Sequence, residues 1–119
     1  MKCVVVLVMM LAVTASAQSS NVSGNWELEM SWPETKSTGA CTFQQEGQNL
    51  KGTCGGTERF AVTGKVQGSR LIWQVEVAQD GAAGRMEFSG ELDGQGATIR
   101  GTCSVVGQNS GTFTMKRTR

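Results

Sequence analysis

Apolar and polar residues alternate with a period of two from Ser23 onward, and no stretch repeats with the 3.6-residue period of a helix. Glycine-containing segments interrupt the alternation about every 10 to 13 residues, as turns between short strands do. The pattern therefore predicts eight β-strands, at residues 23–31, 39–46, 49–54, 58–66, 70–78, 84–92, 97–105 and 111–117.

The alternation gives each strand one apolar and one polar face. Trp26, Leu28 and Met30 share a face of the first strand, and Leu71 and Trp73 share a face of the fifth. Charged side chains occupy the opposite faces, which is typical of a sheet with one side on a core and one side in water. Hairpin-length connections favour a closed barrel over a sandwich, which needs longer crossings. The predicted fold class is all-β, an eight-stranded antiparallel up-and-down β-barrel.

Two-residue turns set the register of two hairpins. A turn at Gly68–Ser69 pairs Val66 with Leu71, Gly64 with Trp73, Val62 with Val75 and Phe60 with Val77. A turn at Gly47–Gln48 pairs Gln45 with Leu50, Phe43 with Gly52 and Cys41 with Cys54. Four glycines, Gly52, Gly64, Gly90 and Gly101, fall on the apolar face within strands. They either permit the coiling that closes a small barrel or leave room for a ligand.

Residues 1–17 have the layout of a cleavable signal peptide, with Lys2, an apolar run from Val4 to Val13 and a small-residue end at Ala15–Ala17. The apolar run is too short to span a bilayer. We therefore expect an exported protein, extracellular or periplasmic, in which residues 18–119 form a single barrel domain. Asn21 begins an Asn-Val-Ser triplet, a glycosylation acceptor in a eukaryote.

Composition excludes several classes of protein. The chain has no His, which removes the commonest general base and the commonest zinc ligand. The formal net charge is +1, unlike that of a nucleic-acid binder. Glu27 and Glu29 lie on one polar face, and Glu76 and Glu87 are expected to be surface neighbours across two strands. We therefore expect no enzyme, no catalytic residue, no metal and no cofactor.

Three cysteines follow the predicted signal peptide: Cys41, Cys54 and Cys103. The hairpin register brings Cys41 opposite Cys54, and export favours a disulfide between them. The alternative is three reduced, buried thiols that behave as small apolar side chains. Cys103 is either buried or links two chains, so a homo-oligomer is left open.

The strands resemble those of the calycins, and among them the avidin and streptavidin family. Gly24-Asn25-Trp26 matches the Gly-x-Trp that opens avidins and lipocalins, and further short matches include Leu50–Thr53, Arg59–Gly64, Leu71–Val75 and Gly111–Thr114. The resemblance implies an up-and-down barrel whose Trp26 packs at the closed end. It also implies a basic residue of the last strand near Trp26, namely Arg117, with Lys116 and Arg119 as alternatives.

The biotin pocket of that family is not retained. Cys54 stands where avidins have a Tyr, Val77 and Cys103 stand where they have Trp, and Phe88 replaces another Trp. Asn109 is a loose counterpart of a late polar ligand residue. Because unmatched polar atoms of a buried ligand cost about 1–3 kcal/mol each, we expect no biotin binding.

These observations lead to three functional hypotheses. The first is a secreted barrel that binds a small apolar molecule, with Trp32, Trp73, Phe88 and Asn109 as candidate ligand residues. Trp32 precedes a predicted loop from Pro33 to Thr38 and has two interpretations. It either contacts a ligand or partner at the barrel mouth, or packs as a lid on its own barrel. The second is an extracellular protein-interaction or protease-inhibitor-like barrel without an internal ligand. The third is a structural envelope or matrix protein with a filled interior.

Overall fold

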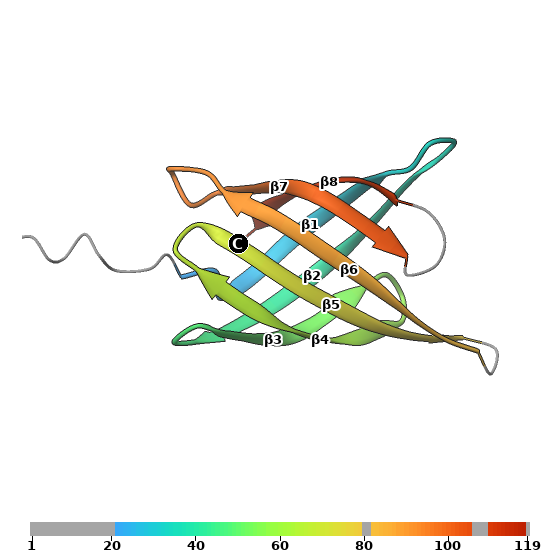
Figure 1. Cartoon of the computed structure of the whole chain (residues 1–119), viewed down its shortest axis with the longest axis horizontal. Helices are drawn as coiled ribbons and strands as arrows, with labels where there is room; N and C mark the ends of the chain where they lie inside the picture. The colour runs from blue at the N-terminus through green and yellow to red at the C-terminus, as the bar shows by residue number, and fades with distance from the viewer. Residues whose placement is uncertain (1–20, 80–81, 106–109, 119) are drawn as a thin grey trace, which may run out of the picture.

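Eight antiparallel strands form a closed barrel in the computed structural model, and each strand pairs with its neighbours in sequence, β8 closing onto β1 (Figure 1). The structure describes residues 21–79, 82–105 and 110–118. The predicted fold class is confirmed. The strands are β1 (Gly24–Ser31), β2 (Lys36–Glu46), β3 (Asn49–Gly55), β4 (Arg59–Gln67), β5 (Arg70–Gln79), β6 (Ala82–Leu92), β7 (Thr98–Val105) and β8 (Ser110–Thr118).

The boundaries follow the alternation closely, except at the start of β2. This strand begins at Lys36 rather than at residue 39, so the predicted loop from Pro33 to Thr38 is wrong. Lys36 pairs with Ser31, and the Trp32 N–H donates to the Thr35 carbonyl across a tight turn at 2.8 Å. The polar start of β2 carries no apolar signal, and its backbone is extended because β1 offers it hydrogen-bond partners.

Both predicted hairpin registers are present. Cys41 pairs with Cys54 across β2 and β3, and Gly64 pairs with Trp73 across β4 and β5. The ladder between β4 and β5 ends at Val62 and Val75, so the predicted pairing of Phe60 with Val77 is not formed. Beyond Val75, β5 pairs with β6 but not with β4, whose Phe60 pairs with Cys54 of β3.

Aromatic rings fill the middle of the barrel. Trp73 stacks on Phe88 with ring centroids 4.9 Å apart and planes 5° apart. Phe43 and Phe113 meet the Trp73 ring edge-on, each at 5.3 Å. All four side chains are at most 3% exposed, and they belong to a buried cluster to which every strand contributes. Aromatic pairs in these geometries add about 0.5–1.5 kcal/mol each to the effect of burial.

The inward glycines mark places where neighbouring strands approach closely. A Cβ on Gly64 would lie 2.5 Å from Trp73 Cβ and against the Ile72 carbonyl oxygen. A Cβ on Gly90 would lie 2.8 Å from the Phe113 ring, and Cβ atoms on Gly52 and Gly101 would overlap backbone carbonyls of adjacent strands. The space beside these glycines is therefore occupied by protein. This supports the interpretation that the glycines permit the strands to coil, and not the interpretation that they leave room for a ligand.

A disulfide joins Cys41 to Cys54, as the hairpin register predicted, with Cα atoms 4.0 Å apart. Both residues face the core and are at most 3% exposed. Cys103 is a free thiol and is also buried. Burial raises the pKa of the Cys103 thiol, so the group is protonated at neutral pH.

Candidate functional site

The two ends of the barrel differ, and we name them by the residues that characterise them. At the Arg117 end, β1 begins and β8 finishes; at the Trp32 end, β1 finishes and β2 begins (Figure 1). The chain segment before β1 covers the Arg117 end. Val22 of this segment is fully buried, and its carbonyl accepts a hydrogen bond of 3.0 Å from Trp26 Nε1. The indole N–H is thus satisfied inside the core.

Arg117 fixes the same segment from the opposite end of the sequence. Its guanidinium carbon lies 4.5 Å from the centroid of the Trp26 ring, the contact that the avidin resemblance implied. Its nitrogens donate to the carbonyls of Asn21, Ser23 and Gly96 at 2.9–3.1 Å. Lys116, an alternative to Arg117, is exposed on the outer wall, and Arg119 lies outside the described residues. Arg117 therefore combines a cation–π contact with three charge-assisted hydrogen bonds.

Gly24 serves the same end by its backbone conformation. Its φ angle is +131°, which residues with a Cβ rarely adopt. The side chain of Gln45 completes the arrangement, because its Oε1 accepts from the Val22 N–H at 2.9 Å. The Arg117 end is thus closed by directed polar contacts around a buried Trp and Val.

Trp32 packs on its own barrel. The residue is half-buried against the core, and its Nε1 donates to Ser37 Oγ at 3.1 Å. The ring lies beside Gly111, where an added Cβ would come within 3.0 Å of Trp32 Cε3. Of the two interpretations of Trp32, this geometry supports the packed lid, with part of the ring left exposed to solvent.

Four further apolar side chains at this end are also half-buried. They belong to the inward-facing set, but the described residues bury them only in part. With Trp32 they form what we call the apolar rim: Met30, Trp32, Phe60, Val77 and Met86. The alternation places Met30, Phe60, Val77 and Met86 on the apolar face, and it does not indicate that they are only partly buried. For Met30 and Phe60, their position next to a turn was the available signal.

Trp73 and Phe88, two of the candidate ligand residues, lie in the filled core and contact each other. One polar atom there is unsatisfied: Trp73 Nε1 is buried and has no hydrogen-bond partner among the described residues. Asn109, the remaining candidate, lies outside the residues that the structure describes.

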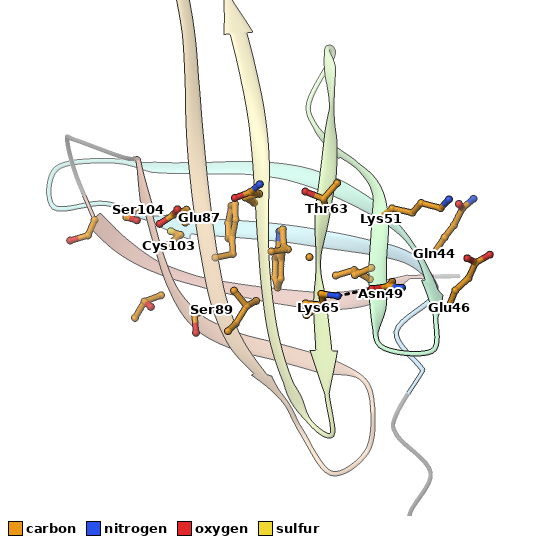
Figure 2. Close-up of a pocket in the computed structure, with 18 residues that line it drawn as sticks. Gln44, Glu46, Asn49, Lys51, Thr63, Lys65, Glu87, Ser89, Cys103 and Ser104 are labelled. Carbon is orange, nitrogen blue, oxygen red and sulfur yellow. Dashed lines mark hydrogen bonds between the residues drawn. The ribbon is translucent and has the colours of Figure 1, made fainter.

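Two hollows among the described residues open on the outer wall. The larger, of about 870 Å³, crosses the strands from β2 to β8, and its solvent-facing lining includes Lys51, Thr63 and Ser89 (Figure 2). A smaller hollow of about 200 Å³ crosses β1, β2 and β8. Leu50 and Trp73 contribute backbone to the floor of the larger hollow, because their side chains are at most 2% exposed. Neither hollow enters the interior that the described strands enclose.

The acidic residues are placed on the surface. Glu27 and Glu29 are exposed. In the register of β5 and β6, Glu76 lies opposite Arg85 and Glu87 lies opposite Gln74, so Glu76 and Glu87 are diagonal neighbours. Within residues 21–79, 82–105 and 110–118, no three potential metal ligands cluster.

Hydrogen bonds from backbone N–H groups, first that of Ala97, lower the pKa of Asp93 in the turn after β6. This carboxylate orders a turn.

Comparison of the chain with protein-family models, curated proteins and solved structures returns no match. The barrel itself is compatible with a calycin-like fold. In the described part of the chain, no helix has the length and apolarity needed to cross a membrane.

Proposed function

We propose that this protein is an extracellular or periplasmic protein-interaction barrel that presents its Trp32 end to another protein. The observation that carries the proposal is the unequal covering of the core. Aromatic rings fill the interior, and among the described residues the apolar rim holds five large apolar side chains that are only partly buried against the core, all at the Trp32 end. Several apolar groups that keep part of their surface in water at one end of a protein are a feature of interaction sites.

Three features support this function over an internal pocket. The two hollows described above lie on the outer wall. A Cβ added to any of the four inward glycines would meet protein atoms. The rim includes a Trp, a residue type enriched where proteins bind each other. The Cys41–Cys54 disulfide suits an oxidising compartment. Inhibition of a secreted protease is one activity that such a protein-interaction barrel could have, with the rim or the turns beside it blocking the active site of the protease.

Site-specific photocrosslinking tests the proposal. A photoreactive amino acid replaces Glu34, an exposed residue of the turn beside Trp32, and in a matched control it replaces Gln48, exposed in a turn at the Arg117 end. In the extracellular or periplasmic fluid of the source cells, we expect a covalent adduct of defined mass from position 34 and none from position 48. Trp32→Ala should remove the adduct. An adduct common to both positions, or indifferent to Trp32→Ala, would overturn the proposal.

Binding of a small apolar molecule is the second candidate function, and one observation favours it. The unpartnered Trp73 Nε1 is a buried donor, and leaving such a group unsatisfied costs about 1–3 kcal/mol. An apolar molecule that carries one hydrogen-bond acceptor would satisfy the N–H if the surrounding rings moved apart.

Mass spectrometry of an organic extract of the denatured protein separates the two candidates. Internal binding requires a compound in molar proportion to the protein, and Trp73→Phe, which keeps a ring but removes the N–H, should lose it. An empty extract, together with Trp fluorescence that lipophilic probes leave unchanged, would exclude the second candidate and leave the first standing.

A further inference from the structure

The larger hollow on the outer wall is a groove between two rows of outward side chains that cross the strands. Paired residues Lys51, Thr63, Gln74 and Glu87 make one row, and Lys65, Ile72 and Ser89 belong to the other. The inward residues between the two rows, among them Gly64 and Trp73, supply the floor with their backbone. The groove is therefore a property of the wall and is independent of the apolar rim.

An exposed apolar side chain lies in the middle of the second row. Ile72 is 51% exposed, and it is the one exposed large apolar residue among those that the structure describes. It interrupts the alternation of β5, since its outward neighbours are Arg70 and Gln74. Removing such a side chain from water stabilises an association, which gives this position on the wall a reason to be covered.

The charged groove residues on the two strands next to Ile72 differ in sign, with Lys65 on β4 and Glu87 on β6. Glu46 lies farther away, on β2. Lys51 and Lys65 lie on β3 and β4, and neither forms an ion pair with any described residue. Glu87 and Glu91 lie on β6, paired loosely at 3.6 Å with exposed Arg85 and Arg70. Figure 2 shows Lys51 and Lys65 toward one side of the groove and Glu87 toward the other.

We propose that a second copy of this chain covers the groove and forms a two-fold symmetric dimer. A two-fold interface must be complementary to itself. Lys65, Ile72 and Ser89 are successive partners in one row, so Lys65 and Ser89 are equally spaced on either side of Ile72. A two-fold axis along β5, in the plane of contact, brings the Ile72 side chains together. It also places Lys65 opposite Ser89 of the second copy, between that copy's Glu87 and Glu91.

Sedimentation of the full mature chain at concentrations from about 1 μM to about 1 mM tests the dimer. We expect wild type to shift from monomer to dimer within this range. Ile72→Ser should raise the dissociation constant about tenfold, because it removes the central apolar contact. Lys65→Glu should raise it at least about tenfold, because it faces two carboxylates. Lys65→Glu combined with Glu87→Lys should return it to within about threefold of wild type.

Matched controls separate this interface from other effects. Glu27→Lys changes an exposed charge on β1, outside the groove, and should leave the dissociation constant unchanged. Trp32→Ala should also leave it unchanged, so failure of the dimer and failure of the proposed function are distinct results. A chain that stays monomeric throughout the range would overturn the proposal. So would a dimer that Ile72→Ser and Lys65→Glu leave intact.

Discussion

The two ends of this barrel close in different ways. At the Arg117 end, a segment outside the strands inserts Val22 beneath Trp26, and Arg117 donates to Ser23 from 94 residues away. At the Trp32 end, the covering residue belongs to a tight turn, and its one side-chain hydrogen bond joins it to Ser37, five residues away. One end is closed by long-range directed contacts and the other by local packing.

The difference shows what each end is suited to do. Directed hydrogen bonds to backbone carbonyls require one geometry, and at the Arg117 end the donors and acceptors both belong to this chain. Apolar packing has no such directionality, and the apolar rim keeps part of its surface in water. The barrel thus has a structural end and an end whose surface is available for contact, and substitutions at the two ends should have different consequences.

The largest expected contrast comes from the two tryptophans. Trp26→Ala removes a fully packed ring and should lower the free energy of unfolding by about 3–5 kcal/mol. Trp32→Ala removes a half-exposed ring and should lower it by about 1 kcal/mol. Urea unfolding followed by circular dichroism measures both variants. Equal losses would contradict the assignment of one structural end and one contact end.

The disulfide lies between the two ends, since Cys41 pairs with Trp26 of β1 and Cys54 pairs with Phe60 of the rim. Cys41→Ala combined with Cys54→Ala should lower the free energy of unfolding by about 3 kcal/mol, because the bond restricts the unfolded chain. Urea unfolding measures the loss. Cys103→Ala is the control: it keeps the disulfide and should cost about 1 kcal/mol through the small cavity it creates. If reduction of wild type leaves its stability unchanged, this expectation fails.

Arg117 tests whether directed contacts hold the Arg117 end. Arg117→Ala should lower the free energy of unfolding by about 1–2 kcal/mol, through loss of the cation–π contact and of hydrogen bonds at a solvent-exposed group. Arg117→Lys keeps the charge but not the planar fork, so it should recover only part of the loss. Hydrogen exchange of the Trp26 indole N–H should accelerate in both variants, and full recovery by Lys would show that charge alone suffices.

Asp93 gives the smallest and most local effect. Because its pKa is lowered in the folded protein by hydrogen bonds from Ala97 and its neighbours, the carboxylate stabilises the fold above its unfolded pKa of about 3.9. That stabilisation is lost as pH falls through the lowered pKa. The stability difference between wild type and Asp93→Asn should therefore be constant near neutral pH and shrink in acid. Chemical unfolding at several pH values measures it, and a difference that grows in acid would contradict the assignment.

Local chemistry explains which parts of the fold were predictable. The alternation fixed the faces of the strands, and two-residue turns fixed the hairpin that brings Cys41 to Cys54. The start of β2 was not predictable in this way, because Lys36, Ser37 and Thr38 are all polar and show no apolar–polar alternation, although Ser37 pairs with Met30 in the barrel. The separation of β4 from β5 beyond Val62 has no local signal either, since it depends on how the barrel is arranged around both strands.

The candidate sites were less predictable than the fold. Ile72 breaks the alternation of β5 and was visible in the sequence, yet its neighbours across the wall, Lys65 and Ser89, became meaningful only with the register. Likewise, Met30 and Phe60 are inward residues by pattern, and their exposure depends on their height in the barrel.

The sequence by itself determined eight strands and their inward faces, because these follow from period-two alternation and short turns between neighbours. It favoured a closed barrel over a sandwich and a Cys41–Cys54 disulfide over free thiols, and the structure contains both the barrel and the disulfide. Only the tertiary structure decided that rings and strands occupy the space beside the inward glycines, and that one end is closed while the other keeps an apolar rim. Those features depend on which distant residues meet when the barrel closes. Closure joins β1 to β8, and the alternation of apolar and polar residues does not specify how far along the barrel axis their side chains then lie.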